Sequence, residues 1–211
     1  LYVAAVTGDL GERAFCLALS LLPVSRLISV GLALDTFGPF VEEAVIGVAQ
    51  LIAVWQVIRL QNLPREAILI QATGRMRVNG PLIAVASVGV GVVGAWLSGA
   101  RMTIDVLSAS PTLISAGVVL AWLGAFVECM VFYGLILPAT QRLIGTSSGL
   151  VFVALIWALR FGVMPWAYMG LMLAQGAVLA WLTTRTQSML YAVLAHWLMI
   201  LAFFSAAALL G

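Results

Sequence analysis

The chain has 211 residues, of which 64% are hydrophobic and 9% are charged, and its mean hydropathy is +1.15. Soluble globular domains carry about 25% charged residues, so this composition excludes a soluble protein and indicates a single integral membrane domain over residues 1–211. The net charge is only +2, and the ten basic residues, all arginines, are spread along the chain. We therefore expect no nucleic-acid partner.

Seven apolar segments follow one another, and most approach the roughly 20 residues that a helix needs to cross about 30 Å of hydrocarbon. We treat the first as a true span rather than a signal peptide, because it is long and no small-residue cleavage site follows it. The sequence shows no alternating barrel pattern, so we expect an all-α bundle of about seven transmembrane helices. The segments cover residues 14–34, 40–58, 82–98, 112–138, 148–161, 165–183 and 189–210.

The arginines are distributed unevenly between the two ends of these segments. An odd number of spans places the N-terminus and the second, fourth and sixth loops on one side, and the opposite loops hold Arg101. Loops rich in arginine face the cytoplasm. We therefore expect a protein of the plasma membrane with a cytoplasmic N-terminus and Gly211 outside. The arginines on the cytoplasmic side are Arg13, Arg59, Arg65, Arg75, Arg77, Arg142 and Arg185.

Three polar features of the sequence have ordinary structural explanations. Arg26 lies inside the first span, and we expect it to form an ion pair. Glu42 and Glu43 open the second span, where acidic side chains complement a helix N-terminus. We expect Thr146 and Ser147 to cap the fifth helix, since a nucleophile elbow needs a strand before it.

Glu128 lies in the middle of the apolar run over residues 113–138. A carboxylate at that depth costs a few kcal/mol, so it normally faces the bundle interior and marks a function. One structural explanation is a neutral acid hydrogen-bonded to Tyr133 or to His196. His196, the only histidine, has a similar explanation as an interior donor to a backbone carbonyl or to Glu128. One glutamate and one histidine are too few for a zinc site of about three protein ligands, so we expect no metal.

The stretch Glu128-Cys-Met-Val-Phe-Tyr-Gly134 resembles the first motif of the CPBP family of intramembrane proteases, which includes CAAX-processing and bacteriocin-processing relatives. That motif reads Glu-Glu-x-x-x-Arg, so Glu128 matches while Cys129 and Tyr133 replace the second Glu and the Arg. The resemblance covers residues 113–210, about half of the chain. It implies a CPBP-like core in residues 112–211, preceded by N-terminal helices and a cytoplasmic loop in residues 1–111.

The other two family motifs are Phe-x-x-x-His and His-x-x-x-Asn. In the best register Trp157 stands at the Phe and Phe161 replaces the first histidine, while His196 matches the second histidine and Ile200 replaces the Asn. In the family the glutamate and the second-motif histidine activate water, and the last His and Asn stabilise the oxyanion. The resemblance therefore implies that Glu128 and His196 are remnants of a catalytic site, left without helper groups.

These losses predict a catalytically degenerate CPBP-like protein of a bacterial membrane that is not a peptidase. It would act as an accessory, scaffold or assembly subunit of a larger membrane complex, with lipids and other integral membrane subunits as partners. Two alternatives stay open. The first is an active intramembrane endopeptidase that uses Glu128 and His196. The second is a tetrapyrrole-binding subunit in which His196 ligates the metal; no other cofactor is expected.

Overall fold

The computed structural model describes residues 10–31, 39–60, 79–99, 111–160 and 164–210, without the side chains of 24–31, 39–44 and a few single positions. The elements in these ranges are all helical, and α5, η3 and α6 follow one another without a break. The described part of the chain therefore contains seven helical stretches, as the sequence predicts. The elements are α2 (Leu10–Gly31), α3 (Pro39–Leu60), α4 (Gly80–Ser98), α5 (Pro111–Cys129), η3 (Met130–Ile136), α6 (Leu137–Ile144), α7 (Thr146–Leu159), α8 (Trp166–Thr186) and α9 (Leu190–Leu210).

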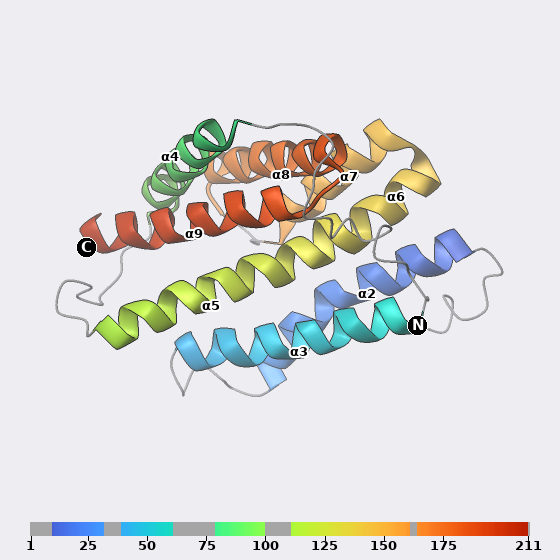
Figure 1. Cartoon of the computed structure of the whole chain (residues 1–211), viewed down its shortest axis with the longest axis horizontal. Coiled ribbons are helices and arrows are strands. Elements are labelled where there is room, and N and C mark those ends of the chain that lie inside the picture. Colours follow the sequence, from blue (N-terminus) through green and yellow to red (C-terminus); the bar gives the residue numbers. More distant parts are fainter. Residues whose placement is uncertain (1–9, 32–38, 61–78, 100–110, 161–163, 211) are drawn as a thin grey trace.

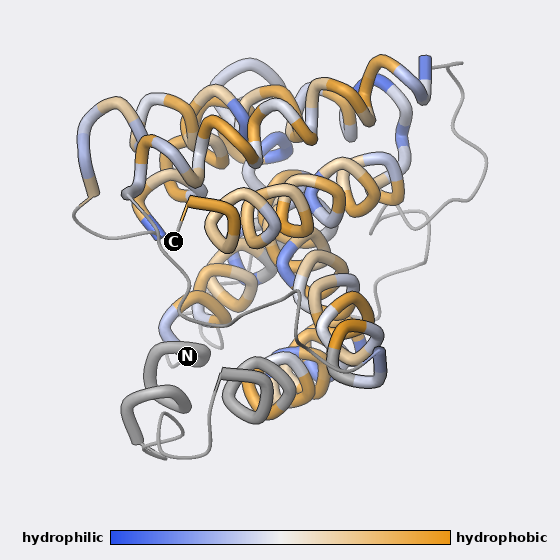
Figure 2. The backbone as a smooth tube through the Cα atoms, turned by 90° about the vertical axis from the view of Figure 1, so that its left-hand side faces the viewer, coloured by the Kyte–Doolittle hydropathy of each residue, from blue (hydrophilic) through white to orange (hydrophobic). Residues whose placement is uncertain are grey.

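Four described stretches are long and apolar enough to cross a membrane. They are Gly80–Ser98, Ile114–Ile144, Trp166–Thr186 and Leu190–Leu210. Two further apolar helices, Val45–Leu60 and Thr146–Leu159, are shorter, and hydrophobic positions dominate the helices in Figure 2. An all-α membrane bundle is thus confirmed, whereas the number of seven complete spans stays a prediction.

The continuous rod α5–η3–α6 runs along the molecule between α2 and α3 on one side and α4, α8 and α9 on the other (Figure 1). With α5–η3–α6 taken as one rod, successive helices run in opposite directions along the bundle (Figure 1). The start of α2 and the ends of α3, α6 and α8 therefore lie at the same end of the bundle. The described arginines at these positions are Arg13, Arg59, Arg142 and Arg185.

The fourth span does not end at Pro138, as the sequence predicts, but continues to Ile144. The seven residues Met130–Ile136 form a π-helix, and the backbone N–H of Leu137 donates to the carbonyl of Phe132, five residues back. Proline has no N–H and its ring clashes with the preceding turn of an α-helix. The wider π-helical turn precedes Pro138, which lies in the first turn of α6 and so leaves the rod unbroken.

The prediction that Thr146 and Ser147 cap the fifth helix is wrong. The helix already begins at Thr146, and the capping residue is Gly145, with no side-chain capping hydrogen bond. Gly145 has φ 87° and ψ 163°, a conformation open almost only to glycine. The turn between α6 and α7 thus depends on backbone angles at Gly145 that residues with a side chain rarely adopt. The predictions for Arg26, Glu42 and Glu43 concern side chains outside the described ones.

The main core of buried side chains surrounds η3, all seven residues of which are buried. Side chains from α2, α3, α7, α8 and α9 converge on this turn, and they include Leu17, Leu21, Val54, Trp157, Leu179 and Val193. Helices in a membrane gain little from hydrophobic burial against each other, so close packing and polar contacts hold them together. The convergence on η3 places Glu128, two residues before it, at the junction of the bundle.

Helices α4 and α9 approach each other closely at one glycine. A Cβ atom added to Gly91 would clash with the carbonyl oxygen of Met199, and it would lie 2.8 Å from the Cβ of Ala202. Gly89, on the same helix, has no atom within 4 Å of such a Cβ. Substitutions at Gly91 and Gly89 therefore test whether the backbones of α4 and α9 are in contact.

We predict that Gly91→Ala lowers the free energy of unfolding by about 1–3 kcal/mol, because the backbone of α9 must move to admit the methyl group. Gly89→Ala should change it by less than about 1 kcal/mol, since the new methyl group faces open space. Thermal or denaturant unfolding in detergent measures both variants. Equal effects of the two substitutions would contradict the close approach of α4 and α9.

Candidate functional site

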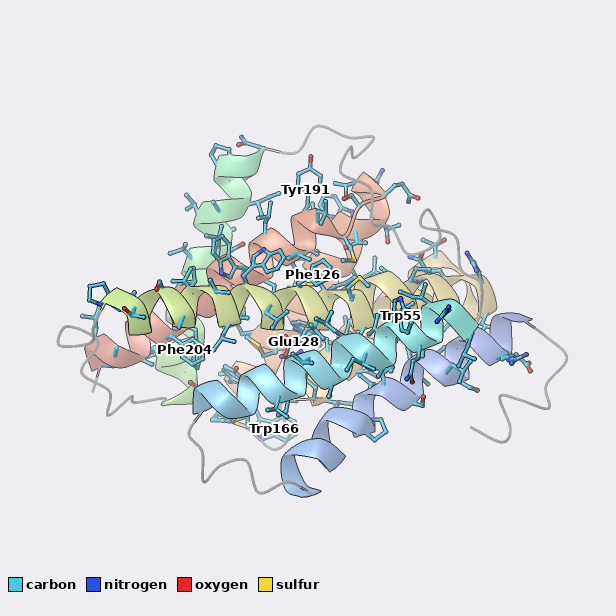
Figure 3. The ribbon with its side chains drawn as sticks, turned by 60° about the horizontal axis from the view of Figure 1, so that its bottom comes forward. Trp55, Phe126, Glu128, Trp166, Tyr191 and Phe204 are labelled. Atoms are coloured by element: carbon cyan, nitrogen blue, oxygen red, sulfur yellow. The ribbon has the colours of Figure 1, made fainter. Side chains whose placement is uncertain are left out.

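Glu128 lies about half-way along the rod (Figure 3), and both of its carboxylate oxygens have partners. Oε1 accepts a hydrogen bond from Arg160 Nη2 at 2.5 Å, and Oε2 lies 2.6 Å from His196 Nε2. The side chains of Glu128 and Arg160 are 26% and 23% exposed, and His196 is fully buried. The site is thus an ion pair extended by an imidazole, which joins α5, the end of α7 and α9.

The length of α7 explains why an arginine reaches this depth. The helix has 14 residues, so it is about 21 Å long and shorter than the hydrocarbon core of a bilayer. Arg160, its C-terminal capping residue, therefore needs a partner for its charge within the protein. The carboxylate of Glu128 supplies it, and the carbonyl end of α7 adds favourable electrostatics.

A chain of hydrogen bonds continues from His196 into the core. Gln175 Nε2 lies 3.4 Å from His196 Nδ1, and Trp157 Nε1 donates to Gln175 Oε1 at 3.5 Å. One assignment satisfies every group: the tryptophan and the glutamine amide donate along the chain, and a neutral His196 donates from Nε2 to the carboxylate. With Glu128 ionised and Arg160 cationic, the network is then neutral overall.

Trp157 is the packing centre of this network. The Arg160 guanidinium carbon lies 4.3 Å from the Trp157 ring centroid, and the His196 ring meets the indole edge-on at 4.9 Å. Trp157 is fully buried. A Cβ atom added to Gly176 of α8 would lie 2.9 Å from the indole, so glycine at this position leaves room for the ring. The indole thus holds both partners of Glu128 in place.

The structure corrects one expectation about Glu128 and confirms part of another. The acid and imidazole are not without helpers, because Arg160 and Gln175 also bind the pair. Of the two partners expected for Glu128, His196 is confirmed, whereas the fully buried hydroxyl of Tyr133 has no partner among the described residues. The ring of Tyr133 packs instead against Trp157, at 5.5 Å between centroids.

The remaining motif positions bring no further polar group to the described site. Cys129 is fully buried with a free thiol, and Ile200 lies one helical turn after His196 on α9. Phe161, expected at a histidine's position, lies outside the described residues. Among the described motif positions, only Glu128 and His196 therefore carry side chains that exchange hydrogen bonds with each other.

Arg160 and Gln175 were missed as site residues, although each leaves a signal in the sequence. Arg160 directly follows the apolar stretch 149–159, and Gln175 lies in the middle of the apolar stretch 166–182. An unpaired charge inside a membrane is costly, so a cation in one span and an acid in another are natural partners. That rule pairs Arg160 with Glu128, whereas no sequence rule joins Gln175 to His196 across α8 and α9.

No cluster of three or more His, Cys, Asp or Glu side chains that could hold a metal ion occurs within the described ranges. A tetrapyrrole metal needs one free imidazole nitrogen. Both nitrogens of His196 have partners, Glu128 and Gln175, so a metal ligand at this position would have to break one of these contacts.

Comparison with known proteins adds one match, to the family model described as "Rce1-like: Type II CAAX prenyl endopeptidase Rce1-like", over residues 110–202. The match begins at α5 and ends within α9, so it contains every residue of the network around Glu128. No curated protein and no solved structure matches the chain. The match agrees with the resemblance found in the sequence and covers nearly the same residues.

We predict that Gln175→Met destabilises the protein by about 1–2 kcal/mol, because it removes the buried hydrogen bonds of Gln175 with Trp157 Nε1 and His196 Nδ1. The volume of the side chain hardly changes, so packing is a small term. Tyr133→Phe is the matched control: it removes a hydroxyl that has no described partner, and it should be neutral or stabilising. A larger loss in Tyr133→Phe than in Gln175→Met would contradict the hydrogen-bond chain.

Proposed function

We propose that this protein, whose residues 110–202 form an Rce1-like domain of the CPBP family, is a non-catalytic member that serves as a scaffold or assembly subunit of a larger membrane complex. The observation that carries the proposal is the contact between Arg160 and Glu128. In this view the glutamate and histidine of the family fold have become structural groups. Their role is to fasten helices together inside the bilayer.

The geometry of the carboxylate supports an inactive site. A general base must have an oxygen within hydrogen-bond reach of the proton that it takes from water. Glu128 Oε1 is bound by Arg160 and Oε2 by His196. Each oxygen thus already accepts a hydrogen bond, one of them from a cation, and this weakens the carboxylate as an acceptor for a proton from water.

The lack of an oxyanion donor at the third motif also supports an inactive site. Peptide hydrolysis needs hydrogen-bond donors aimed at the oxygen that becomes negative, and losing one such donor lowers the rate about 10²–10³-fold. Ile200, where the family motif has Asn, has no donor. His196 Nε2 is already engaged with Glu128.

A partner in the membrane is the second half of the proposal. The described part of α4 is the least buried of the four candidate spans, with 17% of its apolar window buried. A span so loosely enclosed is available to lipid and to the spans of other subunits. We further propose that the arginine-bearing end of the bundle faces the cytoplasm, as the positive-inside rule requires.

The second candidate function is an active intramembrane endopeptidase. The observation in its favour is the 2.6 Å contact between His196 Nε2 and Glu128 Oε2, because paired acid and imidazole groups perform general acid–base catalysis. No described contact favours the tetrapyrrole alternative. An absorption spectrum of gently purified protein tests it directly.

We predict that the purified protein does not cleave a fluorogenic prenylated CAAX peptide in detergent micelles. We also predict that it co-migrates with another integral membrane protein after extraction in mild detergent. Glu128→Gln should lower the stability of the bundle but preserve this co-migration in the protein that remains folded, because the function does not depend on a general base. The exposed Glu12 provides a matched control variant, Glu12→Gln.

Two results would contradict the proposed function. One is peptide cleavage that Glu128→Ala or His196→Ala abolishes while the protein stays folded, which would establish the endopeptidase. The other is a monodisperse protein that migrates alone under conditions in which known membrane complexes remain intact.

A further inference from the structure

Arg160 is held beside Glu128 by several contacts of its own. Its guanidinium carbon lies 4.3 Å from the ring centroid of Trp157 and 5.8 Å from that of Phe132. Trp157 lies one helical turn earlier on α7, so helix geometry places the two side chains on the same face. Stacking on aromatic faces favours a cation, and the C-terminal end of α7 favours it again. The position of the guanidinium is thus defined by α7 and not by Glu128 alone.

The hydrogen bonds among Glu128, His196 and Gln175 do not involve Arg160. His196 Nε2 binds Glu128 Oε2, and the imidazole is supported from the other side by Gln175. Only Oε1 of Glu128 is taken by the guanidinium. If Arg160 moved away, one carboxylate oxygen would become free while the acid and imidazole stayed together.

We propose that Arg160 is an autoinhibitory counter-ion: its guanidinium stabilises the ionised carboxylate of Glu128 and so weakens the Glu128–His196 pair as a proton acceptor. The inference rests on the proposed non-catalytic function, and it attributes the lack of catalytic activity to the ion pair between Arg160 and Glu128. Both side chains of the ion pair are about a quarter exposed, so the contact can be reached from outside the core.

The charge balance of the site predicts what happens to the protonation of the Glu128–His196 pair when Arg160 is removed. With Arg160 present, one cation and one anion cancel and His196 stays neutral. Without the guanidinium, the pair would carry one negative charge in apolar surroundings, a state that is strongly disfavoured. The Glu128–His196 pair then takes up one proton from water, and a protonated carboxyl group becomes available.

Dicyclohexylcarbodiimide is an apolar reagent for such groups. The carboxyl oxygen bonds to the central carbon of the carbodiimide, the carboxyl proton moves to one of its nitrogens, and the adduct rearranges to a stable N-acylurea. No oxidant or other reactant is needed. Mass spectrometry of the peptide that contains Glu128 reports the extent of labelling in the full chain.

We expect wild-type Glu128 to resist this reagent, and Arg160→Gln to label about tenfold faster or more, since a charge-assisted hydrogen bond is lost. Arg160→Lys keeps the cation without the forked geometry, so its rate should lie between the two. Arg142→Gln, in the exposed last turn of α6, is the matched control and should label as slowly as the wild type.

Three results would overturn the inference: rapid labelling of the wild type, unchanged labelling in Arg160→Gln, or equal acceleration in Arg142→Gln. If Arg160→Gln does not yield folded protein, Arg160→Lys decides, and a rate equal to that of the wild type refutes the inference. Failure of the scaffold function appears separately, as a protein that migrates alone. The two proposals can therefore fail independently.

Discussion

The carboxylate of Glu128, held between a guanidinium and an imidazole, is the interaction on which the arrangement of the bundle depends. An unpaired charge in the middle of a span costs a few kcal/mol, so the surrounding helices must compensate it. Arg160 does so from the end of α7 and His196 from α9. This requirement places two helices, α7 and α9, around one point of the rod, and the hydrogen bond to Gln175 adds α8.

Packing around the same point follows from this constraint. Trp157 fills the space between the two partners of Glu128, and its indole lies against the backbone of α8 at Gly176. The π-helical turn over Met130–Ile136 is completely buried in the adjacent core. In lipid, where apolar surface gives helices little reason to associate, such close contacts and satisfied polar groups supply the specificity of the fold. The Glu128–His196 pair thereby lies where α5, α7 and α9 meet.

Much of this architecture could be predicted from hydropathy and from single residues. The apolar segments gave the seven helical stretches, and a lone acid and a lone histidine in separate spans identified the pair that the structure brings together. Arg160 was missed because the alignment with the second family motif places Phe161, the next residue, at the histidine position. Gln175 could not be found, since its contact depends on how α8 and α9 face each other. The end of the fourth span near Pro138 and the capping residue Gly145 were predicted wrongly. Both depend on the backbone, through its hydrogen-bond register at Pro138 and its φ angle at Gly145, and hydropathy reports neither.

The most direct test of the central interaction is a double-mutant cycle on Glu128 and Arg160, with unfolding free energies measured in detergent for Glu128→Gln, Arg160→Gln and the double variant. The two side chains share one hydrogen-bonded ion pair that is mostly shielded from solvent. The expected coupling free energy is therefore about 1–3 kcal/mol, with the double variant more stable than the sum of the single losses implies. Losses that simply add would show that the pair does not hold the helices together, and would contradict the account.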